Sequence, residues 1–328
     1  MCTAIMLADT SKRQYVGRTM DFSHLIDPSL YICPRNYIIK EMSTPLEIKN
    51  QYAFMGIGQD TSKVMFAEGM NEKGVAVQAL YLPQYASYLT PYEAVGKEAI
   101  DSLEVVTYLL GNCKSVVDAY AKLQHITIVG TEDTITGTVS PLHWMITDIS
   151  GNCLVLESRA DGIHLIPNPI GVLTNSPNLE WHLTNLCNYM NVSADQCEEK
   201  QWGNVTLTPF GQGGGGFGLP GDDTSPSRFV RAAFLNSNMI PPQDPDEGVN
   251  TLFHMLDTLS IPKGVVMTNR GVCDYTQYIS VMDLQRMKYY FKTYDNNQIL
   301  CATMEPSDHM VDLGKLSDTH KYKPFIRS

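Results

Sequence analysis

The sequence of 328 residues lacks the features of several large classes of protein. No apolar run approaches the ~18 residues of a membrane-spanning helix, so we expect no membrane span. Basic residues are few, 24 against 35 acidic ones, and the net charge of −11 argues against nucleic-acid binding, which needs a basic face. The N-terminus has no basic segment followed by an apolar one, so we expect no secretory signal and a soluble cytoplasmic protein.

The motifs of metal and phosphate sites are also absent. None of the eight cysteines stands in a C-x-x-C spacing, and the eight histidines form neither an H-E-x-x-H motif nor a cysteine–histidine pair by spacing. We therefore expect no metal and no cofactor, and cysteines that are mostly buried free thiols. The glycine-rich stretch 211–221 lacks the Gly-Lys-Ser/Thr ending of a phosphate loop, so we interpret it as a flexible or assembly loop.

What the sequence does contain is a cysteine directly after the initiator methionine. Removal of Met1, which a small second residue permits, would give Cys2 both a thiol and a free α-amino group. Such an amino group has a pKa of about 8, so one residue could supply both the nucleophile and the base of an N-terminal nucleophile. The alternative is a cysteine that merely happens to stand second, because catalytic cysteines are usually internal.

Two short predicted strands would bring charged groups to this cysteine. Residues 2–8 and 14–20 have the composition of strands and are joined by a short polar turn. An antiparallel return over so short a loop places Arg18 beside Cys2, and Asp21 falls just past the strand end. The thiol, the amine, the guanidinium and the carboxylate could therefore converge without any long-range contact.

Strand and helix signals alternate in blocks along the rest of the chain. Strands are predicted at 29–41 with an interruption at Pro34, and at 51–58, 63–67, 74–82, 126–130, within 143–174, at 275–283 and at 286–294. Helices are predicted at 92–111, 115–124 (with Ser115 as N-cap), 178–189, 226–236 and 247–259. Blocks of antiparallel strands beside helices favour two sheets packed face to face with helices outside. No linker divides the chain, so we interpret 1–328 as a single domain.

The motifs resemble those of the choloylglycine hydrolase family of N-terminal nucleophile amidohydrolases, which includes penicillin V acylases and conjugated bile acid hydrolases. The matching stretches are Met1-Cys2-Thr3, GRTMDF at 17–22, PRNY at 34–37, YAFMGIG at 52–58, GMNEKG at 69–74, LTNSPNLEWHLTNL at 173–186, FGQGGGGFGLPGDDTSPSRF at 210–229, IPKGVV at 261–266 and YYFKTYDN at 289–296. The resemblance implies an α+β, four-layer αββα fold and hydrolysis of a small-molecule amide through an acyl-enzyme. It also implies a homotetramer, with 190–220 as the candidate assembly loop.

The resemblance gives each matching site residue a role. Cys2 would attack the amide carbonyl while its own α-amine takes and returns the proton. Asp21 would hold that amine, and Arg18 would favour the thiolate. The side-chain amide of Asn175 and the backbone N–H of Tyr81 would donate hydrogen bonds to the oxyanion.

A further site residue of the family is Arg228, which would tune the electrostatics of Cys2 and Asp21. Without the resemblance these residues have simpler explanations. Asn175 would be an asparagine of a turn, Arg228 a surface or helix-capping arginine, and Asp21 a carboxylate at a strand end.

The residue at position 81 bears on the acyl group. By resemblance, penicillin V acylases tend to have tyrosine there and bile acid hydrolases asparagine. A tyrosine ring could stack on a phenoxy group. The candidates for the acyl pocket, which could equally be ordinary core, are Met20, Phe22, Leu25, Phe66, Tyr81 and Leu142.

We therefore expect a linear-amide hydrolase that cleaves phenoxymethylpenicillin to 6-aminopenicillanic acid and phenoxyacetate. A conjugated bile acid hydrolase and an N-acyl-homoserine lactone acylase are alternatives on the same fold. A glutaminase of the amidotransferase type is a weaker alternative, because we find neither a synthase domain nor a matching glutamine-site motif. A catalytically silent binding protein of the same fold is the alternative from another class.

Overall fold

The N-terminal hairpin lies at the centre of the first of two sheets. The computed structural model describes residues 1–38, 49–61, 63–96 and 98–317. Strand β1 (Cys2–Ala8) pairs antiparallel with β2 (Gln14–Phe22), and Cys2 lies opposite Met20. Both strands are buried almost throughout, as expected of strands that are covered on both faces. The predicted hairpin is therefore confirmed.

Within the described residues, the first sheet has seven strands and the second has eight, and both are antiparallel. The first sheet has the order β14 (Val172–Leu173), β1, β2, β18 (Cys273–Asp283), β19 (Lys288–Thr293) and β20 (Asn296–Thr303), and β17 (Val266–Met267) also pairs with β18. The second has the order β13 (Gly162–Pro167), β12 (Cys153–Arg159), β11 (Leu142–Asp148), β6 (Val75–Tyr81), β5 (Val64–Asn71), β4 (Phe54–Asp60), β3 (Ser29–Cys33) and β21 (Val311–Lys315). Small pairs form from β7 (Ala99–Asp101) with β8 (Thr127–Val129), and from β9 (Glu132–Asp133) with β10 (Thr138–Val139).

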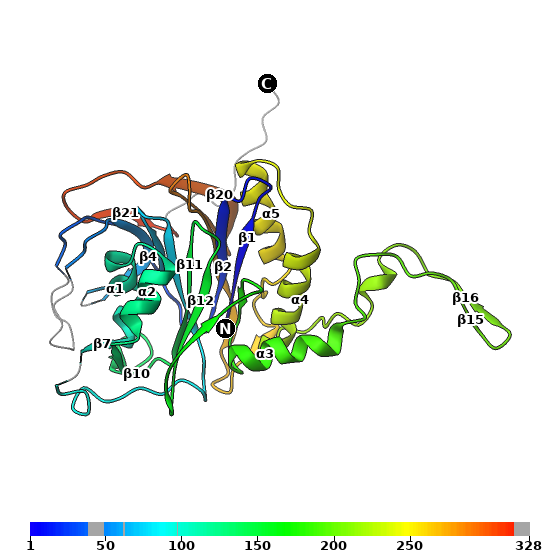
Figure 1. Cartoon of the computed structure of the whole chain (residues 1–328), viewed down its shortest axis with the longest axis horizontal. Helices are drawn as coiled ribbons and strands as arrows, with labels where there is room; N and C mark the ends of the chain where they lie inside the picture. The colour runs from blue at the N-terminus through cyan, green and yellow to red at the C-terminus, as the bar shows by residue number, and fades with distance from the viewer. Residues whose placement is uncertain (39–48, 62, 97, 318–328) are drawn as a thin grey trace, which may run out of the picture.

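Helices cover the outer faces of the two sheets (Figure 1). The second sheet is covered by η1 (Ser102–Glu104), α1 (Val105–Asn112) and α2 (Val116–Leu123). The first is covered by α4 (Ser225–Asn238) and α5 (Pro245–Asp257), with α3 (Leu179–Asn185) and η2 (Leu186–Tyr189) beside α4. The layers are helix, sheet, sheet and helix, which confirms the predicted α+β, αββα fold.

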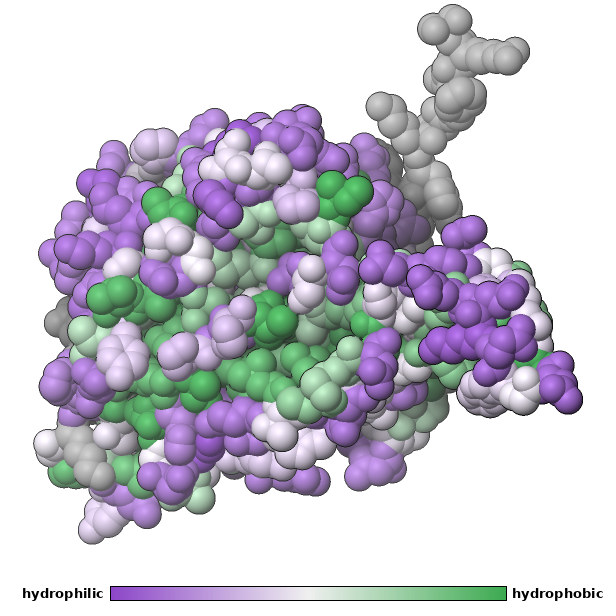
Figure 2. Space-filling model, turned by 45° about the vertical axis from the view of Figure 1, so that its right-hand side comes forward, coloured by the Kyte–Doolittle hydropathy of each residue, from purple (hydrophilic) through white to green (hydrophobic). Residues whose placement is uncertain are grey.

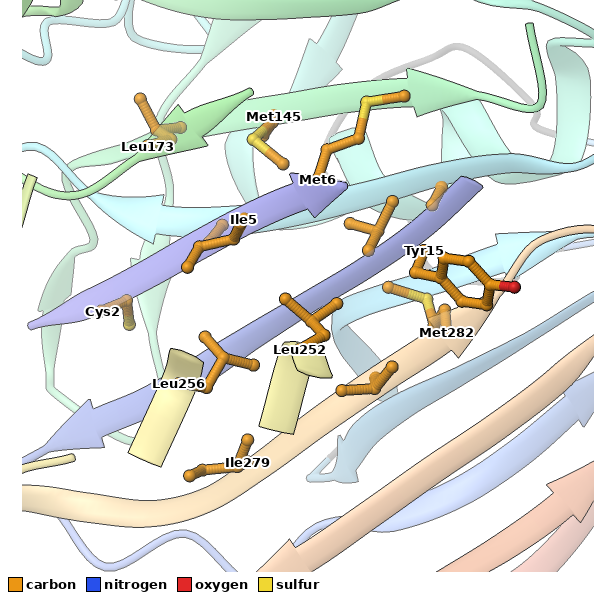
Figure 3. Close-up of a cluster of buried hydrophobic side chains, with 14 of the residues drawn as sticks. Cys2, Ile5, Met6, Tyr15, Met145, Leu173, Leu252, Leu256, Ile279 and Met282 are labelled. Carbon is orange, nitrogen blue, oxygen red and sulfur yellow. The ribbon is translucent and has the colours of Figure 1, made fainter. Parts of the chain in front are cut away.

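Most of the apolar core lies in two large clusters: the first covers both faces of the first sheet, and the second lies between the second sheet and its helices. A small third cluster consists of Ala94, Ala99 and Val129. In the first cluster, Ile5 of β1 and Ile279 of β18 lie near Leu252 and Leu256 of α5 (Figure 3). Each buried aliphatic side chain of this size contributes about 1.5–3 kcal/mol to stability. Cys2 belongs to the same cluster, so the candidate nucleophile is held by core packing and not by a surface loop.

The segment 190–220 extends from the body as an arm (Figure 1). Its far end is the hairpin of β15 (Lys200–Trp202) and β16 (Val205–Leu207), and the glycine-rich stretch 211–221 forms a loop that contains the short η3 (Gly214–Gly216). On the face of the body next to the arm, apolar residues gather in a band (Figure 2).

Three expectations from the sequence are wrong in part. The helix predicted at 92–111 begins only at Val105, because β7 and η1 precede it and the Asp101 side chain caps η1 by accepting a hydrogen bond from the Leu103 N–H. The cysteines are all free, but Cys187, Cys197 and Cys301 are exposed, so they are not mostly buried. Of the strand predicted at 29–41, residues 29–33 form β3, and 39–41 lie outside the described residues.

A glycine in β2 tests the packing of α5 on the first sheet. A Cβ atom at Gly17 would come within 2.8 Å of the Ser280 carbonyl oxygen and 2.9 Å of Leu256 Cδ1. We expect Gly17→Ala to lower the free energy of unfolding by about 1–3 kcal/mol in urea denaturation, because the core has no room for the methyl group. The control is Gly221→Ala, where a Cβ would meet nothing within 4 Å. Equal losses in the two variants would show that α5 does not pack as described.

Candidate active site

A buried arginine contacts the thiol at the start of β1. Cys2 is 2% exposed, and its Sγ accepts a hydrogen bond of 2.7 Å from Nη2 of Arg18. Burial opposes the charged form of Arg18, but the neighbouring Cys2 and Glu68 outweigh it, so the pKa of Arg18 is raised. The guanidinium is therefore a permanent cation, which stabilises negative charge on the sulfur.

Arg18 lies where β5 and β6 separate. These strands pair only between 68–70 and 76–78. Beyond that point, Nη1 of Arg18 donates to the carbonyl oxygens of Ala79, at 2.7 Å, and of Ala67, at 3.5 Å. The guanidinium thus satisfies carbonyl groups that the separated strands no longer pair with each other.

Asn175 and Arg228 hold the backbone of Cys2 from the other side. The Cys2 N–H donates to Oδ1 of Asn175 at 2.8 Å, and Nη2 of Arg228 donates to the same oxygen at 2.7 Å. Nη1 of Arg228 donates to the Cys2 carbonyl oxygen at 2.6 Å. Nδ2 of Asn175 donates to the Tyr81 carbonyl oxygen at 2.7 Å, and its second hydrogen is available for another acceptor. Four predicted site residues therefore meet here.

Asp21 is fully buried near the end of β2. Its carboxylate accepts hydrogen bonds from the hydroxyls of Thr276, at 2.6 Å, and Thr19, at 2.9 Å, and it lies 3.9 Å from Nη1 of Arg228. Burial raises the pKa of the Asp21 carboxyl, while Arg228 and the N-terminal amine oppose the rise. Burial also lowers the pKa of Arg228, against the attraction of Asp21.

Met1 pairs with the backbone of Asp21. The Met1 amine donates to the Asp21 carbonyl oxygen at 2.5 Å, and the Asp21 N–H donates to the Met1 carbonyl oxygen at 3.0 Å. The Cys2 nitrogen itself contacts Asn175. That the Asp21 carboxylate holds the amine of a mature Cys2 stays a prediction.

The register of β6 turns the Tyr81 N–H toward the gap between the strands. The Leu82 N–H donates to the Pro141 carbonyl oxygen at 2.7 Å. Hydrogen-bonding positions alternate along an antiparallel pair, so the Tyr81 N–H faces away from β11 and toward β5. It therefore lies on the side of β6 where the predicted oxyanion donor would be needed.

An apolar cavity opens beside Cys2 and reaches through the gap between β5 and β6 to η1 and α1. Five of the six predicted pocket residues line it, namely Met20, Phe22, Phe66, Tyr81 and Leu142. Leu25 does not, because it follows the end of β2 in a loop and its side chain is 78% exposed beside a separate depression. The lining also includes residues that the sequence interpretation did not assign to the pocket: Leu103, Val106, Ile135 and Trp144.

Tyr81 forms part of the mouth of this cavity. Its ring lies 5.3 Å from that of Phe22, and its hydroxyl is 2.7 Å from the Ser140 hydroxyl. Burial raises the pKa of Tyr81 to about 12, so the phenol is neutral at physiological pH. The lining of the cavity thus includes two neighbouring aromatic rings.

Two buried histidines, which the sequence interpretation overlooked, hold the peptide that carries Asn175. Nε2 of His182 donates to the Asn175 carbonyl oxygen at 2.8 Å, and Nε2 of His143 lies 3.0 Å from the Thr174 carbonyl oxygen. The Asn175 N–H donates to the Ser225 hydroxyl at 2.9 Å. Burial lowers the pKa of His182 to about 4, so the ring is neutral. The place of His182 shortly after the TNSP turn was the one available signal.

No group of three or more histidine, cysteine or acidic residues in the described parts of the chain could hold a metal ion. None of the helices described is both long and apolar enough to cross a membrane.

The model of the choloylglycine hydrolase family, whose members are linear amide C–N hydrolases, matches residues 2–319 of this chain. The chain belongs to this family. It is 36% identical to a bile salt hydrolase/transferase of Clostridium perfringens over 98% of this chain and 97% of that relative. It is 25% identical to a penicillin V acylase of Pectobacterium atrosepticum over 96% of this chain and 82% of that relative. The crystal structure of the C2A mutant of the conjugated bile acid hydrolase of C. perfringens superposes with a TM-score of 0.90 and 33% identity, over 100% of this chain and 99% of that one.

Acid should weaken the cluster around Asn175 through His182. The folded pKa of about 4 lies below the ordinary 6.5, so the unfolded chain binds the extra proton and stability falls as the pH drops between these values. As the pH falls through that range, we expect the protonation of His182 to lower the free energy of unfolding by about 3 kcal/mol. Urea denaturation at a series of pH values measures this loss.

In the variant His182→Gln, the side-chain amide can still donate a hydrogen bond but does not titrate. The free energy of unfolding of this variant should therefore depend less on pH. The control is His254→Gln, because His254 is exposed on α5. A slope that stays at the wild-type value in His182→Gln would show that another group titrates instead.

Proposed function

We propose that this protein hydrolyses the amide bond of conjugated bile acids, with Cys2 as the nucleophile after removal of Met1. The observation that carries the proposal is a buried thiol, in contact with Arg18, beside an apolar cavity. The identity of 36% with a bile salt hydrolase/transferase supports this choice of substrate. We therefore prefer a conjugated bile acid to phenoxymethylpenicillin as the substrate, whereas Tyr81 alone suggested the opposite order.

The proposed reaction proceeds through a thioester. Cys2 Sγ attacks the amide carbonyl carbon, and the Cys2 α-amine takes the thiol proton and passes it to the nitrogen of the leaving amine as the C–N bond breaks. Water then attacks the thioester, with the same amine as base, and releases the acid and the thiol. The free hydrogen of Asn175 Nδ2 and the Tyr81 N–H would stabilise the oxyanion in both steps, and loss of one such donor typically costs about 3 kcal/mol of barrier.

The charges around Cys2 suit this cycle. Arg18 would stabilise the thiolate, while Arg228 fixes the Cys2 carbonyl group and the Asn175 side chain. Asp21 balances Arg228, and its hydroxyl donors keep it fixed in place. A reducing cytoplasm, the location that we expect from the sequence, would keep Cys2 reduced.

Phenoxymethylpenicillin is the second candidate substrate. The observation in its favour is the pair of rings of Tyr81 and Phe22 at the mouth of the cavity, which could stack on a phenoxy group. The match to a penicillin V acylase at 25% identity is compatible with it.

A side-by-side assay separates these candidates. The purified protein, with loss of Met1 checked by mass spectrometry, is given a glycine-conjugated bile acid and phenoxymethylpenicillin under reducing conditions. We expect a higher kcat/KM for the bile acid, and no turnover of either substrate by Cys2→Ala. Tyr81→Asn should raise the preference for the bile acid roughly three- to tenfold, because a ring contact for the phenoxy group is lost.

Each other outcome of the assay has a definite meaning. Faster hydrolysis of the penicillin would restore the order that Tyr81 suggested. Residual turnover by Cys2→Ala would exclude Cys2 as the nucleophile. Binding without turnover by the mature wild-type protein would indicate the silent binding protein.

We also propose that the chain forms a homotetramer through its arm, 190–220. The arm carries large apolar side chains that are mostly exposed in the single chain, and the most exposed of them are Met190, Trp202, Phe210 and Phe217. Exposed apolar surface on this scale is typical of an interface with another chain.

Light scattering tests this assembly. We expect a mass about four times the 36.6 kDa of one chain. The double variant Trp202→Ala/Phe217→Ala should reduce the mass, since it removes apolar contact area. Tyr92→Ala is the control, because Tyr92 is 88% exposed but lies outside the arm. A wild-type mass near that of one chain would rule the tetramer out.

A further inference from the structure

We infer that Glu68 is a positioning residue for the reaction, and that its carboxylate is the permanent counter-charge of Arg18 while the charge on the Cys2 sulfur changes. The inference rests on the proposed function in one respect, that Cys2 is the nucleophile. Nothing in the sequence interpretation pointed to Glu68, which directly precedes the GMNEKG stretch at 69–74 and falls just outside the strand predicted at 63–67.

Glu68 contacts Arg18 from the facing sheet. Its side chain is completely buried, and Oε2 lies 3.8 Å from Nε of Arg18. Oε1 accepts a hydrogen bond of 2.7 Å from the Ser280 hydroxyl, and Nε2 of Gln78 lies 3.5 Å from Oε2. Burial raises the pKa of Glu68, while Arg18 and Ser280 oppose the rise.

The strand register fixes these groups relative to one another. Arg18 of β2 lies directly opposite Ser280 of β18, so both side chains point to the same face of the first sheet. Glu68 of β5 forms the last paired position with Gln78 of β6 before the two strands separate. The carboxylate is therefore held at the closed end of the gap, and Arg18 extends from it toward Cys2.

In the parts of the chain that the structure describes, the remaining titratable groups around Glu68 are two phenols. Tyr278 of β18 and Tyr289 of β19 are fully buried, and burial, followed by the charge of Glu68, raises the pKa of both well above the ordinary value. Both phenols are therefore neutral at physiological pH. Among the described residues, Arg18 is the one cation at ion-pair distance from Glu68.

The charge of the sulfur changes during the proposed reaction, whereas the charge of Arg18 does not. A thiolate is a second anion for Arg18, but a thioester is neutral. Without Glu68, Arg18 would be a buried cation with no anionic partner in the acyl-enzyme, which is unfavourable. The thiolate would also be its only anion in the free enzyme. A thiolate held so strongly is easier to form but less nucleophilic.

The experiment measures alkylation of Cys2 by iodoacetamide as a function of pH. Mass spectrometry of the N-terminal peptide separates Cys2 from the exposed cysteines, and no amide substrate is needed. In Glu68→Gln we expect the midpoint of the pH profile to move down by about one pH unit and the plateau rate to fall a few-fold. Glu68→Asp, which keeps the charge, should return the midpoint toward the wild-type value.

A matched control removes a carboxylate from an ion pair elsewhere. Glu72 pairs with Arg35 at 2.6 Å, and Glu72→Gln should leave the midpoint unchanged. An unchanged or higher midpoint in Glu68→Gln would overturn the inference. If Glu68→Gln does not fold, Ser280→Ala takes its place. This variant removes the hydrogen bond that favours the charged form of the Glu68 carboxylate. It should therefore lower the alkylation midpoint, but by less than Glu68→Gln would. No shift in Ser280→Ala would then overturn the inference.

Turnover measured in parallel keeps the two proposals apart. We expect kcat/KM of Glu68→Gln to fall about tenfold, because a less nucleophilic thiolate attacks the amide more slowly. If the wild-type protein is alkylated as described but hydrolyses no amide, the proposed function is wrong, and the alkylation midpoints alone still test the role of Glu68. If the wild-type protein hydrolyses the amide but the midpoint is the same in Glu68→Gln, the inference about Glu68 is wrong and the proposed function stands.

Discussion

A single guanidinium, buried between two sheets, holds the candidate site in its shape. Arg18 donates to the Cys2 sulfur, to the carbonyl oxygens of Ala67 and Ala79 at the gap between β5 and β6, and to that of Thr19 in its own strand. Only arginine offers enough donors in a fixed planar arrangement for all four contacts, and a lysine could not span them. Arg18 also lines the cavity where it passes between β5 and β6, so the thiol and the pocket depend on the same side chain.

The residues near Cys2 in the sequence were predictable, because a hairpin is a local structure. Residues 2–8 and 14–20 carry strand signals, and a short turn between them leaves little choice of register, so the approach of Arg18 to Cys2 followed from spacing alone. Asn175 and Arg228 are different. They lie 173 and 226 positions from Cys2, and no property of either residue reveals the contact, so only the family resemblance could suggest it.

The misplaced predictions have local causes. The apolar pattern of 92–111 continues through the short strand β7, and the cap provided by Asp101 was not recognised as a helix start. Leu25 was predicted as an apolar pocket residue, but β2 ends at Phe22 and Leu25 is exposed in the loop that follows. His182 and Glu68 were overlooked because a buried polar residue has the same letter as an exposed one, and its burial depends on partners from other strands.

The burial of the two arginines affects how the site responds to the salt concentration. Arg18, Arg228, Asp21 and Glu68 are each 0% exposed. Mobile ions screen charges at a protein surface within about 10 Å at moderate salt, but they cannot enter the packed layers that hold these four side chains. The balance of charge around the thiol should therefore be largely independent of ionic strength, and the same nucleophile would be available in dilute and in concentrated salt.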